Sequence, residues 1–222
     1  MGRVEFFFDP MCPWAYQSSV WMRDVRDRSD VEVRWRFFSL EEVNRQEGKK
    51  HPWEREWSYG WSLMRVGAWL GRRDEGLLDA WYAATGAALF ERAERPHRRE
   101  VAEELAAGIG APGAVAEALA DPSTTDEVRA DHEWLAAEHA GYGVPTLVFP
   151  EERRALFGPV VVPAPTGAAA LRLWDLVTGW LEFPSLYELR SPKTPADWDR
   201  IGTAFRPYLD ARDWQTIQRP VD

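Results

Sequence analysis

The sequence predicts an α/β protein in which a long helical segment interrupts a small sheet. Residues 4–8 form an apolar run, a helical pattern follows over 13–28, and residues 31–37 alternate strictly between apolar and polar side chains. Strict alternation is typical of a strand with one buried face. From about residue 41 to 140 the apolar residues recur at helical spacing instead, and strand-like sequence then returns. The predicted order is therefore β-α-β, a helical insertion, and β-β-α.

The first helix is expected over Pro13 to Arg28. Proline suits the first helical position because its missing N–H would have no partner there, and Trp14, Trp21 and Val25 follow at helical spacing. A right-handed crossover through this helix makes the two flanking strands parallel. Ligands of open α/β sheets bind beyond the carboxyl ends of the strands, which is where Cys12 lies.

The segment 41–140 is expected to contain helices only. The predicted helices are one with the stripe Trp53, Trp57, Trp61, Met64 and Ala68, one over 76–93, short ones over 98–108 and 112–120, and one from a capping box at 124–127 to Gly141. An aromatic stripe usually packs a core, and it can also line a pocket for a planar substrate. Both interpretations stay open for the tryptophans.

The end of the chain completes the sheet. A strand over 144–149, a turn and a strand over 155–157 predict a hairpin. Thr166 is expected to cap a last core helix, whose buried face carries Ala170, Leu173, Trp174, Val177 and Leu181. We predict one domain from 1–40 and 141–190, an insertion at 41–140, and a proline-containing tail at 191–222 around a short helix with Trp198, Ile201 and Phe205. The sequence assigns that tail no function.

Composition limits the classes of function. The 222 residues are 45% hydrophobic and 28% charged, which is ordinary for a globular protein with a sizeable core. A net charge of −9 argues against a nucleic-acid surface, and the basic run 92–99 is expected to be a solvated helix face. No apolar run is long enough to span a bilayer, and no signal peptide is recognisable. We therefore expect a cytoplasmic protein without nucleic-acid or membrane partners.

The chain also lacks the motifs of common cofactor sites. One cysteine excludes an intramolecular disulfide and a multi-cysteine metal site. The four histidines show no metal-ligand spacing or triad pattern, so no metal is expected. The glycine pairs at 108–110 and 141–143 lack a phosphate-binding context, so no nucleotide is expected either.

Cys12 is the leading candidate for chemistry. A sulfur at a helix N-terminus meets unpaired backbone N–H groups and the positive end of the helix dipole, which favour the thiolate. Such sites lower a cysteine pKa from about 8.5 to roughly 3.5–7.5. The alternative is a buried structural cysteine, because free cysteine is among the most buried residue types.

Three segments resemble a known family: Phe8 to Trp14 (FDPMCPW), Gly143 to Thr146 (GVPT), and Phe157 to Pro159 (FGP) ahead of the helix through Leu173 and Trp174. Together with the element order, they resemble the thioredoxin fold in its DsbA-like form over nearly the whole chain. The resemblance is greatest to actinobacterial DsbA-like oxidoreductases that work with mycothiol. It extends more distantly to hydroxychromene-carboxylate isomerases and kappa-class glutathione transferases.

The resemblance implies roles for particular residues. Cys12 matches the attacking thiol of a Cys-Pro-Trp-Cys motif, and its substrate-binding surroundings would be Pro13, Trp14, Tyr16, Val144 and Pro145. Pro145 matches the family's cis-proline, which presents the backbone of Val144 to the sulfur, and Tyr16 is a candidate to orient a bound thiol. The insertion would fold over the site as a lid. The fourth motif position, however, is Ala15, so no second thiol can release a mixed disulfide and the chain is monothiol.

Three functions remain open. The first is a monothiol oxidoreductase or thiol transferase in which Cys12 is the nucleophile and a low-molecular-weight thiol, mycothiol or a glutathione-like compound, completes the cycle. The second is a kappa-like transferase or isomerase in which Cys12 makes no covalent bond. The third is a catalytically silent binding protein. The expected partners are a small thiol and a small-molecule or disulfide substrate, and a homodimer stays open.

Overall fold

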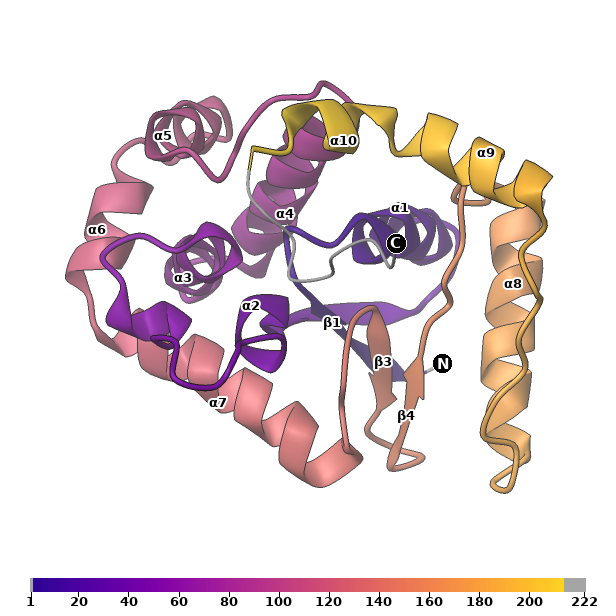
Figure 1. The fold of residues 1–222 in the computed structure, drawn as a ribbon. Helices are drawn as coiled ribbons and strands as arrows, with labels where there is room; N and C mark the ends of the chain where they lie inside the picture. The colour runs from indigo at the N-terminus through magenta and orange to yellow at the C-terminus, as the bar shows by residue number, and fades with distance from the viewer. Residues whose placement is uncertain (1, 214–222) are drawn as a thin grey trace.

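The computed structural model describes residues 2–213 (Figure 1). Its sheet has the order β2-β1-β3-β4, formed by β1 (Arg3–Phe8), β2 (Glu32–Phe37), β3 (Thr146–Phe149) and β4 (Arg154–Phe157). Strand β1 pairs parallel with β2 and antiparallel with β3, and β3 and β4 form an antiparallel hairpin. The predicted β-α-β unit and hairpin are thus confirmed.

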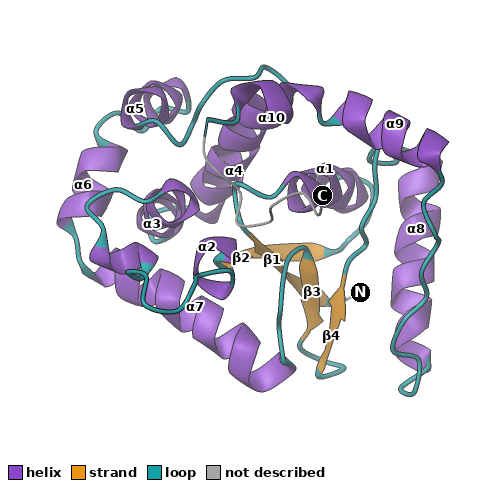
Figure 2. Cartoon of the chain, viewed as in Figure 1, coloured by secondary structure: helices purple, strands orange, loops and turns teal. Residues whose placement is uncertain are grey.

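Helices surround this sheet (Figure 2). Those between the strands are α1 (Pro13–Arg26), α2 (Leu40–Val43), the 3-10 turn η1 (Pro52–Glu54), α3 (Tyr59–Gly71), α4 (Glu75–Phe90), α5 (Arg99–Gly108), α6 (Ala114–Ala120) and α7 (Ser123–His139). After the sheet come α8 (Ala168–Gly179), η2 (Trp180–Glu182), α9 (Pro195–Ala204) and α10 (Arg206–Ala211). The described part of the insertion contains no strand, as predicted.

Helices cover both faces of the sheet, and successive side chains of β1 pack against them in turn. Phe8 stacks on Tyr82 of α4, with ring centroids 3.8 Å apart, whereas Phe7 stacks on Trp134 of α7 at 5.8 Å. Successive strand residues point to opposite faces, so α4 and α7 cover different sides. Helices α1 and α8 share the side of α4, where Trp21 of α1 and Trp174 of α8 pack at 6.1 Å.

The tryptophan stripe is only partly helical. Trp53 lies in η1 and Trp57 precedes α3, so the prediction of one helix through both was wrong. Trp57 donates through Nε1 to the carbonyl oxygen of His97 at 2.7 Å, and the rings of Trp53 and Trp61 pack at 5.1 Å. Pro52 begins the 3-10 turn, and the chain then enters α3 at Ser58. Trp53 and Trp61 pack in the main hydrophobic core, whereas Trp57 packs in a second cluster.

Two predicted caps were also wrong. Thr124 lies inside α7 and donates to the carbonyl oxygen of Ala118 at 2.9 Å, while Asp121 accepts the N–H of Ser123 ahead of it. Gly167, not Thr166, is the N-cap of α8, and its N–H donates to Asp24 of α1 at 2.8 Å. In both cases a carboxylate close in space satisfies the helix end in place of the nearest hydroxyl.

The tail forms two helices where the sequence predicted one. Figure 1 shows α9 starting near α8 and α10 crossing above the end of α4, with α1 beneath. Phe205 joins the two helices, and Pro207 stands at the start of α10, where proline is tolerated. The rest of the predicted tail, residues 214–222 with Pro220, lies outside the described residues.

Candidate active site

Cys12 is the N-cap of α1, as the sequence predicted. Its backbone is extended (φ −92°, ψ 113°), and its Sγ accepts a hydrogen bond from the N–H of Ala15 at 3.4 Å. Pro13 occupies the first helical position and is half-buried. The sulfur therefore stands where a side-chain acceptor satisfies an otherwise unpaired helix N–H.

The loop before β3 meets this sulfur from the other half of the fold. The thiol of Cys12 lies 3.6 Å from the carbonyl oxygen of Val144, within reach to donate to it, and the Val144–Pro145 peptide bond is cis. Two hydrogen bonds hold the loop: Pro145 accepts the N–H of Gly158 at 2.8 Å, and the Thr146 hydroxyl donates to Gly143 at 2.8 Å. The structure thus brings together three predicted site residues, Cys12, Val144 and Pro145.

The expected low pKa of Cys12 was wrong for this structure. The residue is only 5% exposed and belongs to the main hydrophobic core, with Phe8, Trp61 and Val144. Burial raises the pKa of the Cys12 thiol to about 12, more than the N–H of Ala15 lowers it. Loss of water around a charged sulfur therefore outweighs the helix N-terminus.

Asp9 is a site residue that the sequence analysis missed. It is 1% exposed, and its two carboxyl oxygens accept the N–H groups of Met11 and Leu40, each at 2.8 Å. Burial raises the pKa of Asp9 to about 7, and the negative charge of Asp9 in turn raises the pKa of Cys12. The available sequence signal was a carboxylate directly after a buried strand, at the edge where the sheet binds ligands.

Gly60, near the start of α3, lies close over this carboxyl group. A Cβ built there would come within 2.7 Å of Asp9 Oδ1 and 3.2 Å of Met11 Cγ. Only a residue without a side chain allows the helix to approach so closely. The carboxyl group of Asp9 is therefore covered by α3 and hydrogen-bonded to the backbone of Met11 and Leu40. These contacts hold it in place, three residues before the thiol in sequence.

Trp14 follows the thiol by two residues, in the first turn of α1, and is half-buried. Its ring meets the ring of Phe205 edge to face, with centroids 4.8 Å apart and planes at 84°. Phe205 comes from the tail, so the residue expected to contact substrate is covered by a segment that the sequence analysis left without a role.

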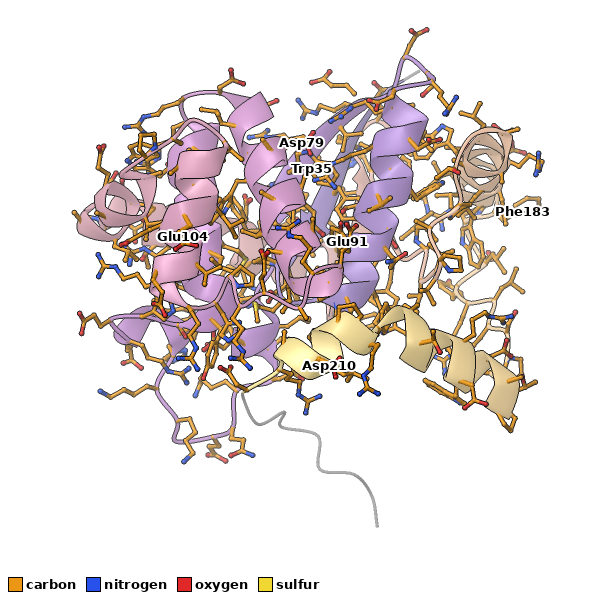
Figure 3. All side chains as sticks on the ribbon, turned by 90° about the horizontal axis from the view of Figure 1, so that it is seen from above. Trp35, Asp79, Glu91, Glu104, Phe183 and Asp210 are labelled. Carbon is orange, nitrogen blue, oxygen red and sulfur yellow. The ribbon has the colours of Figure 1, made fainter. Side chains whose placement is uncertain are left out.

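Tyr16 does not have the role expected of it. Its hydroxyl donates to Glu91 at 2.5 Å, and its ring stacks on Phe90 at 5.1 Å, in a hydrophobic cluster separate from that of Cys12. Figure 3 shows Glu91 between α4 and α1, on the side where α10 crosses. A Cβ on Gly86 would come within 2.2 Å of the Tyr16 ring. Tyr16 thus joins α1 to α4 rather than presenting its hydroxyl to the sulfur.

Two cavities of the structure lie away from the thiol. One of about 420 Å³ is lined by Glu5, Arg36, Trp134 and His139 among others, and one of about 210 Å³ by Arg26, Trp35 and Asp79 among others. Within residues 2–213, no three His, Cys, Asp or Glu side chains are grouped as a metal site. In the same residues, no helix is both long and apolar enough to cross a membrane.

Comparison with solved structures places the fold. The chain resembles the probable DsbA oxidoreductase SCO1869 from Streptomyces coelicolor (TM-score 0.53, 23% identity, covering 86% of this chain and 94% of that one). It also resembles the cytosolic disulfide reductase DsbM from Pseudomonas aeruginosa (TM-score 0.55, 17% identity, 79% and 98%) and a 2-hydroxychromene-2-carboxylate isomerase (TM-score 0.58, 15% identity, 80% and 94%). The fold and the site together define a thioredoxin-fold protein of the DsbA-like class, as the sequence predicted.

Sequence comparison is more specific. The model of the Rv2466c-like family, described as mycothiol-dependent nitroreductase Rv2466c, matches residues 11–191. The chain is also 54% identical over 220 residues to the uncharacterized protein Rv2286c of Mycobacterium tuberculosis (strain ATCC 25618 / H37Rv), covering 99% of this chain and 94% of the relative. The chain belongs to the Rv2466c-like family. The family match begins one residue before Cys12 and ends before α9.

Proposed function

We propose that the protein is a monothiol oxidoreductase in which Cys12 is the nucleophile and a low-molecular-weight thiol, mycothiol, completes the cycle in the cytoplasm. The observation that carries this proposal is the position of Sγ, with the N–H of Ala15 on one side and the carbonyl oxygen of Val144 on the other. The first group stabilises a thiolate, and the second belongs to a backbone that an extended thiol compound can pair with. The description of the family supports the choice of mycothiol.

The cycle must pass through an external thiol because Ala15 replaces a second cysteine. The Cys12 thiolate attacks a disulfide between the substrate and mycothiol at the mycothiol sulfur, and the substrate thiolate leaves and takes up a proton. A second mycothiol, as thiolate, attacks the mycothiol sulfur bound to Cys12. This releases oxidised mycothiol and regenerates the Cys12 thiolate. Each turn exchanges one disulfide for another: the substrate sulfur is reduced to a thiol, the second mycothiol is oxidised, and the first mycothiol stays disulfide-bonded throughout.

Intact-mass measurement tests the proposal. The wild-type protein, incubated with the disulfide form of mycothiol, is expected to gain one mycothiol unit, which excess reduced mycothiol removes. The Cys12→Ser variant is the matched control and gains none. Absence of the adduct from the wild-type protein at every pH at which it stays folded would reject covalent chemistry at Cys12.

The burial of Cys12 favours a second candidate. A thiol that is 5% exposed, with its pKa raised to about 12, suits a site that binds a thiol cofactor without bonding to it. In that case the protein is a transferase or isomerase, and Cys12→Ser retains turnover. Covalent chemistry predicts a loss of about a thousandfold or more for the same variant, because that is the usual cost of removing a nucleophile.

A further inference from the structure

The tail packs directly over the Cys12 site. Phe205 is 8% exposed and lies against Trp14, and Tyr208 of α10 packs on Phe90 with ring centroids 5.6 Å apart. Ala211 is 1% exposed within the same cluster, which Met11 joins from the loop before the thiol. Side chains of α10 therefore fill the surface beside the Cys12 loop. We call residues 195–213 the C-terminal cover.

Tyr208 of the cover interacts electrostatically with the Cys12 thiol. Burial is the main cause that raises the pKa of Tyr208. Arg212, which is hydrogen-bonded to its hydroxyl, lowers that pKa, and the negative charges of Cys12 and Asp9 raise it further. Interaction of this kind requires short separation in a site with little water. The cover thus packs against Trp14 and Met11, the neighbours of Cys12 in sequence, and Tyr208 interacts electrostatically with the thiol.

Ionic contacts at the end of the cover hold it to the insertion. Asp213 accepts a hydrogen bond from His97 Nε2 at 2.7 Å and is bonded to the guanidinium of Arg98. Arg95 donates to the carbonyl oxygen of Ala211 at 3.0 Å. These residues belong to the basic run expected to be a solvated helix face, and the structure places them in the loop between α4 and α5 instead. We call the contacts of Asp213 with Arg95, His97 and Arg98 the latch.

The latch is anchored in the body of the protein. His97 is 2% exposed, its carbonyl oxygen accepts Nε1 of Trp57, and its ring meets that of Tyr59 edge to face at 5.5 Å. The guanidinium of Arg98 and the ring of His97, both hydrogen-bonded to Asp213, lower its pKa to about 2, so its carboxylate is charged at neutral pH. A fixed cationic loop therefore meets an anionic end of the cover.

We propose that the C-terminal cover is a latched gate over Cys12, and that release of Asp213 from Arg95, His97 and Arg98 exposes the sulfur to its substrate. The inference rests on the proposed function, because it assigns the gate to the disulfide and thiol partners of that same sulfur. Such partners are too large to reach the sulfur of a residue that is only 5% exposed. They reach Sγ only when α10 and the Phe205 ring move off Trp14.

Alkylation of Cys12 by iodoacetamide tests the gate in the full-length protein, since the chain has one thiol. Asp213→Asn weakens the latch at an exposed position and leaves the core intact. Because hydrogen bonds between charged groups are among the stronger ones, we expect Asp213→Asn to be alkylated about tenfold faster than wild type at one fixed pH. Asp210→Asn is the control, since Asp210 on α10 pairs only with Arg206 of the same helix among the described residues (Figure 3). It is expected to match wild type.

A second measurement follows the cover itself. Hydrogen exchange of the α10 amides should become faster in Asp213→Asn and stay unchanged in Asp210→Asn. Equal alkylation rates for wild type and Asp213→Asn, despite faster exchange in α10, would overturn the gate. So would wild-type alkylation as fast as that of the urea-unfolded chain.

The outcomes separate the gate from the proposed function. Faster alkylation of Asp213→Asn, with no mycothiol adduct on any variant, sustains the gate and rejects covalent thiol chemistry. A mycothiol adduct on wild type, together with equal alkylation rates for wild type and Asp213→Asn, supports the proposed function and rejects the gate.

Discussion

Sγ of Cys12 lies 3.6 Å from the carbonyl oxygen of Val144, 132 residues further along the chain. A carbonyl oxygen accepts a proton and repels a negative charge, so this contact suits the protonated thiol. The N–H of Ala15 on the other side suits the thiolate. One sulfur therefore has a partner for each protonation state, and its burial decides between them in favour of the thiol.

The pH dependence of alkylation follows from this balance. Because the pKa of Cys12 is raised to about 12, the thiolate fraction in wild type is small at neutral pH and grows with pH. We expect the alkylation rate to rise steadily up to the limit of the folded protein, without a plateau between about pH 7 and 9, the range that contains an ordinary cysteine pKa near 8.5. A plateau below pH 8 would mean that the thiol is ionised and exposed in solution.

Restoring a second motif thiol changes the cycle. Ala15 stands three residues after Cys12 in the first turn of α1, and its N–H already contacts Sγ. Ala15→Cys is expected to form an intramolecular disulfide with Cys12, so the mycothiol adduct no longer accumulates. Thiol titration before and after oxidation measures this. Two free thiols that survive oxidation would show that α1 holds the sulfurs apart.

The variant carries a cost in stability. Ala15 is fully buried, so the sulfur added in Ala15→Cys overpacks its site. Overpacking of this kind typically lowers the free energy of unfolding by about 1–3 kcal/mol. Ala15→Ser introduces a side chain of similar size without a thiol, and it serves as the control for that effect.

Asp9→Asn is expected to change the dependence of stability on pH. The pKa of Asp9 is raised from 3.8 to about 7 in the folded protein, so folding favours the protonated carboxyl group. Its stabilisation is complete below about pH 4 and is lost as pH rises towards 7. At about 1.4 kcal/mol per pKa unit, the loss is at most about 4 kcal/mol.

Urea unfolding of both proteins between pH 4 and about 8 checks this. The free energy of unfolding of wild type should fall relative to Asp9→Asn up to about pH 7 and run parallel above it. The same variant should lower the pKa of Cys12, because the Asp9 charge raises it. Parallel stability curves throughout would mean that Asp9 is already ionised at pH 4.

Gly86 tests the junction between α1 and α4. A methyl group there would lie 2.2 Å from Cδ2 of Tyr16, whose ring is held by Phe90 and Glu91. We expect Gly86→Ala to lower the free energy of unfolding by about 1–3 kcal/mol, the usual cost of overpacking. Gly202→Ala is the control, because nothing lies within 4 Å of the added methyl group in α9. That variant should be neutral or stabilising by up to about 1 kcal/mol.

The sequence predicted the parts of this fold that depend on local pattern. The apolar run at 4–8, the alternation over 31–37 and Pro13 at a helix start specify β1, β2 and α1 by themselves. Thr124 and Thr166 failed as caps because Asp121 and Asp24 satisfy those helix ends instead. Asp24 is far from α8 in sequence, so no local pattern could identify it.

The candidate site also has features that local sequence predicts and features that it does not. The position of Cys12 at a helix N-terminus is local, and the family motif supplied Val144 and Pro145. Its electrostatics are not local: the thiol is buried by residues from several elements, and Phe205 arrives from nearly two hundred positions away. The expectation of a low pKa for Cys12 considered only the helix N-terminus. It omitted the loss of water around the sulfur, which depends on the complete fold.

The electrostatic interaction between Tyr208 and Cys12 also works in the opposite direction. If covering the sulfur raises its proton affinity, then removing that proton must weaken the covered form by the same free energy, about 1.4 kcal/mol for each pKa unit. Ionisation or modification of one atom in the core is then communicated to the carboxylate of Asp213 at the surface. The chain would signal its own redox state through the mobility of α10.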